Sequence, residues 1–93
     1  MMEGYRLFYH PDILKEDLTH IPANIRSRIR KAIETRLLKD PLLFGRPLRQ
    51  SLKGYRRLRV GDWRVIYRID RSDIIILKIG SRKDVYFEAL KRF

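Results

Sequence analysis

The fold is decided by one stretch of the sequence, YRRLRVGDWRVIY, which runs from Tyr55 to Tyr67. Apolar and basic residues alternate on both sides of Gly61-Asp62, and a two-residue turn at this dipeptide predicts a tight β-hairpin. The turn sets the expected pairs: Val60 with Trp63, Arg59 with Arg64, Leu58 with Val65 and Arg57 with Ile66. Because successive side chains of a strand point to opposite faces, we expect the apolar members Leu58, Val60, Trp63 and Val65 to lie against a core.

The opposite face of this hairpin carries Arg57, Arg59 and Arg64. Like charges directly opposite each other destabilise a sheet by up to about 1 kcal/mol. A cluster of fixed positive charge here therefore indicates that an anionic ligand binds to it. Guanidinium suits phosphate, because its planar fork donates two parallel hydrogen bonds. Two alternatives stay open. In the first, the arginines are solvated or paired with Glu3, Asp17 or Glu88 and bind no ligand. In the second, a turn longer than two residues changes the register and separates the arginines.

Further strands are predicted on either side of the hairpin. Residues 63–70 and 74–80 have strand character and are joined by a turn at Arg71-Ser72-Asp73. The unbroken apolar run from Ile74 to Leu77 is typical of a strand covered on both faces. At the N-terminus, residues 4–10 (GYRLFYH) predict a first strand.

Helices are predicted before and after these strands. Pro11 opens a short helix that ends near His20, and a second helix begins after Pro22. The second helix is marked by an apolar stripe of Ile25, Ile29, Ala32, Ile33 and Leu37. Residues 40–51 contain Pro41, Gly45 and Pro47 and predict an irregular crossover loop. The spacing of Tyr86, Leu90 and Phe93 predicts a last helix over 85–93. The sequence thus predicts one α+β domain over residues 1–93, in the order β-α-α-β-β-β with a short C-terminal helix.

Composition limits the classes of function. The chain of 93 residues has 22 Lys and Arg against 11 Asp and Glu, a formal net charge of +11. This excess predicts a polyanionic partner, RNA or DNA before an acidic protein. The chain has no cysteine, which fits a reducing compartment, and no apolar segment near the roughly 18 residues of a membrane span. Residues 1–9 lack a secretory signal pattern, so we expect a cytoplasmic protein with no membrane partner.

The strand end at residues 79–82 (IGSR) brings Arg82 to the candidate site, and Tyr86 follows four residues later, where a core role is the alternative. The only histidines, His10 and His20, lie far from the arginines in the sequence. No metal-ligand spacing, Gly-rich phosphate loop or Ser/His/Asp pattern is present, and Asp12, Glu16 and Asp17 are expected on a solvated helix surface. We therefore expect no cofactor or metal, and any catalysis must rest on charge stabilisation.

Residues 52–67 (LKGYRRLRVGDWRVIY), followed by 79–82 (IGSR) and Val85-Tyr86, resemble the RelE/ParE family of bacterial and archaeal toxins. Segments 8–18 and 37–48 resemble the same family, so the similarity spans nearly the whole chain. The resemblance implies two N-terminal helices packed on a curved antiparallel sheet. It implies a RelB-like antitoxin as partner, with the free toxin a monomer and the stored form a hetero-oligomer. The RelE-like branch implies cleavage of mRNA in the ribosomal A site, by attack of a 2′-OH that gives a 2′,3′-cyclic phosphate.

The resemblance also implies roles for five residues. Arg57 and Arg59 match basic phosphate-binding positions, and Arg64 matches the arginine that stabilises the transition-state phosphate. Arg82 matches the residue that stabilises or protonates the leaving 5′ oxygen, and Tyr86 matches a proposed general base. Some members have lysine at positions 57 and 59, and many have histidine where this chain has Ser81. Because arginine keeps its proton, Arg57 and Arg59 supply only charge.

Two other functions remain open at this stage. A ParE-like protein of the same fold inhibits DNA gyrase by binding and cuts nothing. A plain RNA-binding module would bind RNA without cleaving it. The complete set of Arg57, Arg59, Arg64, Arg82 and Tyr86 favours the nuclease.

Overall fold

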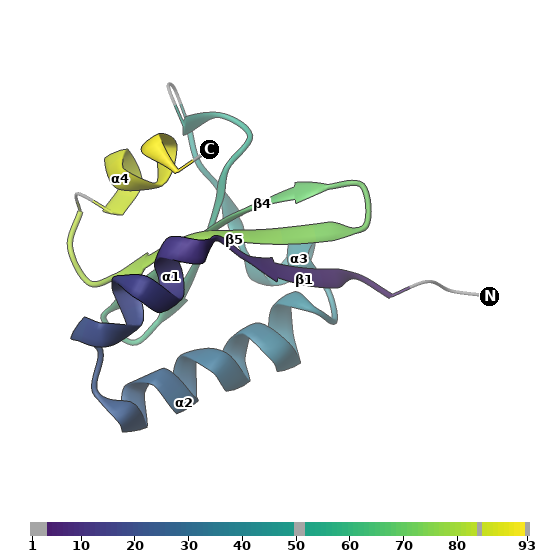
Figure 1. Cartoon of the computed structure of the whole chain (residues 1–93). Coiled ribbons are helices and arrows are strands. Elements are labelled where there is room, and N and C mark those ends of the chain that lie inside the picture. Colours follow the sequence, from purple (N-terminus) through teal and green to yellow (C-terminus); the bar gives the residue numbers. More distant parts are fainter. Residues whose placement is uncertain (1–3, 50–51, 84, 93) are drawn as a thin grey trace.

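A five-stranded sheet runs through the centre of the molecule (Figure 1). The computed structural model describes residues 4–49, 52–83 and 85–92. The strand order is β1-β5-β4-β3-β2. The strands are β1 (Arg6–Tyr9), β2 (Arg46–Pro47), β3 (Arg56–Val60), β4 (Trp63–Asp70) and β5 (Asp73–Gly80).

The β3–β4 hairpin has the predicted register. Val60 pairs with Trp63, Arg59 with Arg64, Leu58 with Val65 and Arg57 with Ile66. Gly61 has a φ of 61°, a left-handed conformation that favours glycine in such a turn. The alternative of a longer turn is therefore excluded, and the three arginines share one face of the sheet.

The β4–β5 turn is tighter than predicted. Asp73 pairs with Asp70 and begins β5, which leaves Arg71 and Ser72 as the turn. Arg71 has a φ of 59°, a left-handed conformation used by two-residue hairpin turns. A register shift between Ile66 and Tyr67 then marks a β-bulge in this pair.

The sheet is mixed, where a wholly antiparallel sheet was expected. Strand β1 pairs in parallel with β5, Phe8 lying opposite Ile75, and the other three strand pairs are antiparallel. Only a tight hairpin forces its two strands to be antiparallel. Strand β1 is connected to β5 through all the intervening elements, so the connection does not decide whether the two strands run parallel or antiparallel.

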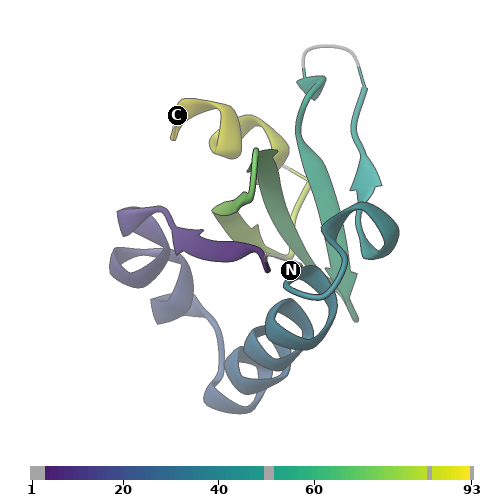
Figure 2. The same cartoon turned by 90° about the vertical axis from the view of Figure 1, so that its right-hand side faces the viewer.

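Helices cover both faces of this sheet. The first face packs on α1 (Pro11–Lys15), the 3₁₀ helix η1 (Asp17–His20), α2 (Ala23–Ala32) and its π-helical continuation η2 (Ile33–Leu37). Ile29, Ile33 and Leu37 of the predicted stripe are buried there. The other face packs on α4 (Val85–Lys91) through Val85 and Ala89. Figure 2 shows α2 and α4 separated by the sheet.

The predicted crossover loop contains two short elements in its described part. Helix α3 (Pro41–Phe44) is capped by Asp40, whose carboxylate accepts a hydrogen bond from the Leu43 N–H at 3.1 Å. Strand β2 begins after one intervening residue, Gly45. Gln50 and Ser51, the end of the predicted loop, lie outside the described residues.

Gly45 lets this segment approach the sheet closely. A Cβ at this position would overlap the Tyr67 hydroxyl, which donates to the Pro41 carbonyl at 2.6 Å. Arg56 donates to the Leu42 and Gly45 carbonyls at 3.0 Å each. These contacts hold α3 and β2 against the sheet.

The last helix is confirmed over Val85–Lys91, and Phe93, which was predicted to extend it, lies outside the described residues. None of the described helices is long and apolar enough to cross a membrane.

Candidate functional site

The candidate arginines gather at the end of the sheet where β5 finishes. Arg59 lies opposite Arg64 on the neighbouring strand, and Arg64 lies opposite Gly80, the last residue of β5. Arg82 follows two residues later. The register of three strands therefore brings these segments side by side.

Tyr86 joins the cluster through α4. The Nη1 of Arg57 donates a hydrogen bond to the Tyr86 hydroxyl at 3.0 Å. Both side chains are half-buried, because Val85 and Ala89 of α4 pack on Ile66 and Leu77 of the sheet. Tyr86 therefore packs against the apolar side chains below α4, as the core alternative expected, and it also accepts a hydrogen bond from Arg57.

Arg64 fixes the segment that carries Arg82. Its Nη1 donates to the Ser81 carbonyl at 2.6 Å. A Cβ on Gly80 would overlap the Val85 side chain, so glycine is required for α4 to begin this close to the strand. A guanidinium has five N–H donors, and the contact with Ser81 leaves Arg64 others for a ligand.

The cluster keeps its positive charge. Among the described residues, no carboxylate forms an ion pair with Arg57, Arg59, Arg64 or Arg82. Arg59 and Arg82 are exposed. Glu88 pairs with Lys78 instead, at 3.0 Å, and Glu3 lies outside the described residues. Arginines without a carboxylate partner, one of them bound to a tyrosine hydroxyl, make a site suited to a phosphodiester.

Asp17 is not on a solvated surface, as was expected, but is buried with an exposure of 3%. Its carboxylate accepts hydrogen bonds from Lys78 Nζ at 2.9 Å, the Ile79 N–H at 2.9 Å and Arg92 Nη1 at 2.8 Å. The short helix η1 packs on β5 and turns this carboxylate inward. Asp17 thereby connects η1, β5 and the end of α4, the helix that carries Tyr86.

The Asp17 network changes the titration of Lys78. Burial lowers the pKa of the Lys78 ammonium, but hydrogen bonds to Asp17 and Glu88 outweigh this effect, so the pKa is raised above its ordinary value. Ion pairs among Asp17, Lys78, Glu88 and Arg92 thus join η1, β5 and the end of α4.

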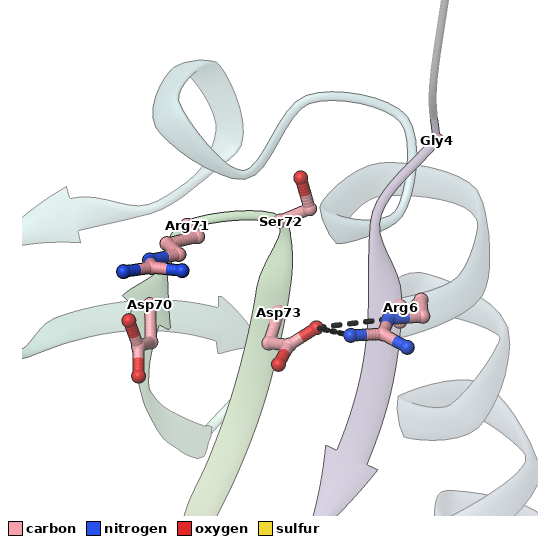
Figure 3. A pocket seen from close by; sticks show the side chains of 6 residues that line it. All are labelled: Gly4, Arg6, Asp70, Arg71, Ser72 and Asp73. Atoms are coloured by element: carbon pink, nitrogen blue, oxygen red, sulfur yellow. Dashed lines mark hydrogen bonds and ion pairs between the residues drawn. The ribbon is translucent and has the colours of Figure 1, made fainter.

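A hollow at the opposite end of the β4–β5 hairpin contains none of the candidate residues. Figure 3 shows its lining: Gly4, Arg6, Asp70, Arg71, Ser72 and Asp73. Arg6 forms an ion pair with Asp73 at 3.0 Å. Since two carboxylates line this hollow, its charge is balanced, and it is poorly suited to a phosphate.

His10 has a structural role at the start of α1. His10 caps α1, because its Nδ1 accepts a hydrogen bond from the Asp12 N–H at 3.1 Å. Within 4–49, 52–83 and 85–92, no group of three or more His, Cys, Asp or Glu is arranged to hold a metal ion.

Comparisons with known proteins all point to one family. The family model described as the ParE toxin of the type II toxin–antitoxin system parDE matches residues 14–86. Toxin RelG of Mycobacterium tuberculosis is 34% identical over 74 residues, which are 77% of this chain and 85% of RelG. Toxin RelE of the same organism is 39% identical over 72 residues, 75% of this chain and 74% of that protein.

A solved structure has the same fold. In the toxin–antitoxin complex RelBE2 from M. tuberculosis, one chain matches with a TM-score of 0.79 and 29% identity, over 86% of this chain and 100% of its own length. With the sequence relatives and the family model, this match establishes that the chain belongs to the RelE/ParE superfamily of toxins of type II toxin–antitoxin systems.

Proposed function

We propose that this toxin is an endoribonuclease that cleaves mRNA on the ribosome and so inhibits translation. The observation that carries the proposal is the hydrogen bond from Arg57 to the Tyr86 hydroxyl within a cluster of otherwise unneutralised arginines. The contact places the Tyr86 hydroxyl directly beside a guanidinium that is itself suited to bind a phosphate. This arrangement suits a general base next to a phosphate.

In the proposed reaction, Tyr86 first releases its phenolic proton to water, and the phenolate oxygen then accepts the proton of a ribose 2′-OH. The 2′ oxygen bonds to the adjacent phosphorus, and the bond from phosphorus to the 5′ oxygen breaks. The products are a 2′,3′-cyclic phosphate and a 5′-OH. Arg64 stabilises the charge that develops on the phosphoryl oxygens. Arg82 donates a hydrogen bond to the departing 5′ oxygen, which takes its proton from water, because a guanidinium does not release one.

Arg57 and Arg59 complete the proposed site as phosphate-binding groups. They lie two residues apart on one face of β3, so a single RNA backbone can contact both. The reaction uses only groups of the chain and the substrate, and we propose no cofactor.

The partners follow from the family and the charge. We propose a RelB-like antitoxin as the partner that holds this toxin inactive, because the RelBE2 match is to a toxin–antitoxin complex. We propose a monomer for the free toxin, a hetero-oligomer for the stored form, and a cytoplasmic location, since ribosomes and mRNA are its targets.

Inhibition of DNA gyrase is the second candidate, favoured by one observation: the matching family model is that of the ParE toxin. Two parallel assays separate the candidates. The first measures cleavage of mRNA on programmed ribosomes, and the second measures supercoiling by gyrase. Cleavage with unimpaired gyrase supports the nuclease. Inhibited gyrase with intact mRNA would replace it with the ParE-like function.

A further inference from the structure

A groove beside the candidate site has no assigned role. It follows the edge of β3 and is lined by Arg36, Phe44, Arg46, Arg57, Leu58 and Arg59. These residues come from η2, α3, β2 and β3. Arg57 and Arg59 thus belong both to the candidate site and to this groove, which makes the two continuous.

The topology of the sheet leaves the groove open. Strand β2 pairs with β3 only at Arg46–Arg57 and Pro47–Arg56. Beyond Arg57, β2 therefore leaves the edge of β3 uncovered. Because directly paired residues in a sheet point to the same face, Arg46 extends the face of Arg57 and the candidate site outward.

The groove is strongly basic. No carboxylate lines it, and the side chains of Arg36, Arg46 and Arg59 form no ion pair with any described residue. The hollow in Figure 3 is the contrast, since there Arg6 is paired with Asp73. Three exposed guanidiniums that form no ion pair with a described residue are suited to successive phosphates of one strand.

Phe44 adds an aromatic surface to this charge. It is 41% exposed although it is a large apolar side chain, and it shares the groove with Arg36 and Arg46. Positively charged grooves with aromatic side chains bind single-stranded nucleic acid, because phosphates contact the charges and an unpaired base stacks on the ring. An acidic protein segment would use the charges but would have no need of a stacking surface.

We propose that this groove is a second binding site for single-stranded RNA, which holds the nucleotides flanking the cleaved bond. Arg36 and Arg46 bind backbone phosphates, and Phe44 stacks on one base. The identity of the strand as RNA rests on the proposed function, but binding in the groove is measurable without cleavage.

The test measures binding of a fluorescent, unstructured RNA oligonucleotide to the full chain over a range of salt concentrations. In the double variant Arg36→Gln/Arg46→Gln, affinity falls, and the slope of log K against log[salt] decreases by about 1.4, since each lost phosphate contact removes about 0.7. Phe44→Leu weakens binding about fivefold or more and leaves the salt slope unchanged, because stacking carries no charge.

The matched control is Lys15→Gln/Arg71→Gln, which removes two exposed charges far from the groove in the sequence and outside its lining. A groove variant that behaves like this control would overturn the proposal. Unchanged RNA binding with weakened binding of the antitoxin would also overturn it and assign the groove to a protein. Specific loss of RNA binding by a toxin that cuts nothing on ribosomes supports the groove and rejects only the nuclease.

Discussion

The hydrogen bond of 3.0 Å from Arg57 Nη1 to the Tyr86 hydroxyl joins the central sheet to the last helix. The two residues are 29 positions apart in the sequence. Arg57 is placed by the β3–β4 register, and Tyr86 is placed by the packing of α4 on Ile66 and Leu77. The proposed base and the guanidinium that contacts it are therefore brought together by two separate parts of the fold.

The Arg57–Tyr86 contact predicts that Arg57→Gln slows mRNA cleavage by about a hundredfold, since a general base contributes about 10²–10⁴ to a rate. Arg57→Lys is the matched control, because it keeps the charge, and we expect it to retain a larger share of the activity. Single-turnover cleavage on ribosomes measures both rates. Equal activity of Arg57→Gln and the wild type would remove Arg57 from the mechanism.

Arg64→Ala and Arg82→Ala are each predicted to abolish growth arrest in cells while the protein stays folded. Loss of one group that stabilises transition-state charge costs about 10²–10³ in rate. Arg82 is exposed, so its removal leaves the core intact, which circular dichroism will verify. Two folded variants that remain fully toxic would place the active site elsewhere.

Asp17→Asn is predicted to lower the free energy of unfolding by about 3–5 kcal/mol, because it leaves Lys78 and Arg92 partly buried without their carboxylate. Glu88→Gln is the control: Glu88 is a half-exposed partner of Lys78, and its loss should cost no more than about 1 kcal/mol. Urea unfolding measures both values. Equal, small effects would show that the buried network contributes little to stability.

Stability is predicted to fall at alkaline pH. Burial raises the pKa of the Tyr67 phenol above 10.0, although Arg56 opposes the shift, and the acidic partners raise the pKa of Lys78 above 10.5. Both groups hold their protons more tightly when folded. Their contribution is therefore complete below these ordinary values and is lost as pH rises through the raised ones.

Tyr67→Phe separates the two groups. It removes the hydrogen bond to the Pro41 carbonyl and should cost about 1 kcal/mol at neutral pH. The variant should also lose less stability than the wild type above about pH 10, because one of the two titrating groups is gone. Urea unfolding at neutral and alkaline pH gives both numbers, and parallel pH profiles would contradict the role of Tyr67.

The parts of the fold set by local patterns were predictable from the sequence. The period-two alternation and the Gly61-Asp62 turn fixed the hairpin register, and hence the common face of Arg57, Arg59 and Arg64. The Asp17 network was not predictable, because its partners Lys78 and Arg92 are 61 and 75 residues away. A helix of four residues also has too few turns to reveal which side faces the core.

The candidate groove was missed for the same reason. Arg36 belongs to the polar side of a helix, and Arg46 and Phe44 belong to a segment expected to be irregular. The pairing of Arg46 with Arg57 brings them together, and a two-residue strand gives no periodic signal. Phe44 was the available sequence signal for the groove, because it is an aromatic residue in a Pro- and Gly-containing segment and outside the predicted core positions.

Cleavage of RNA by Tyr86 and the candidate arginines is tested most directly by primer extension on mRNA bound to programmed ribosomes. We expect cuts confined to the A-site codon, products that end in a 2′,3′-cyclic phosphate, and loss of these cuts in Tyr86→Phe and Arg64→Ala. Cuts of undiminished strength in Tyr86→Phe would contradict the proposed base. Intact mRNA with a folded, toxic protein would contradict the nuclease itself.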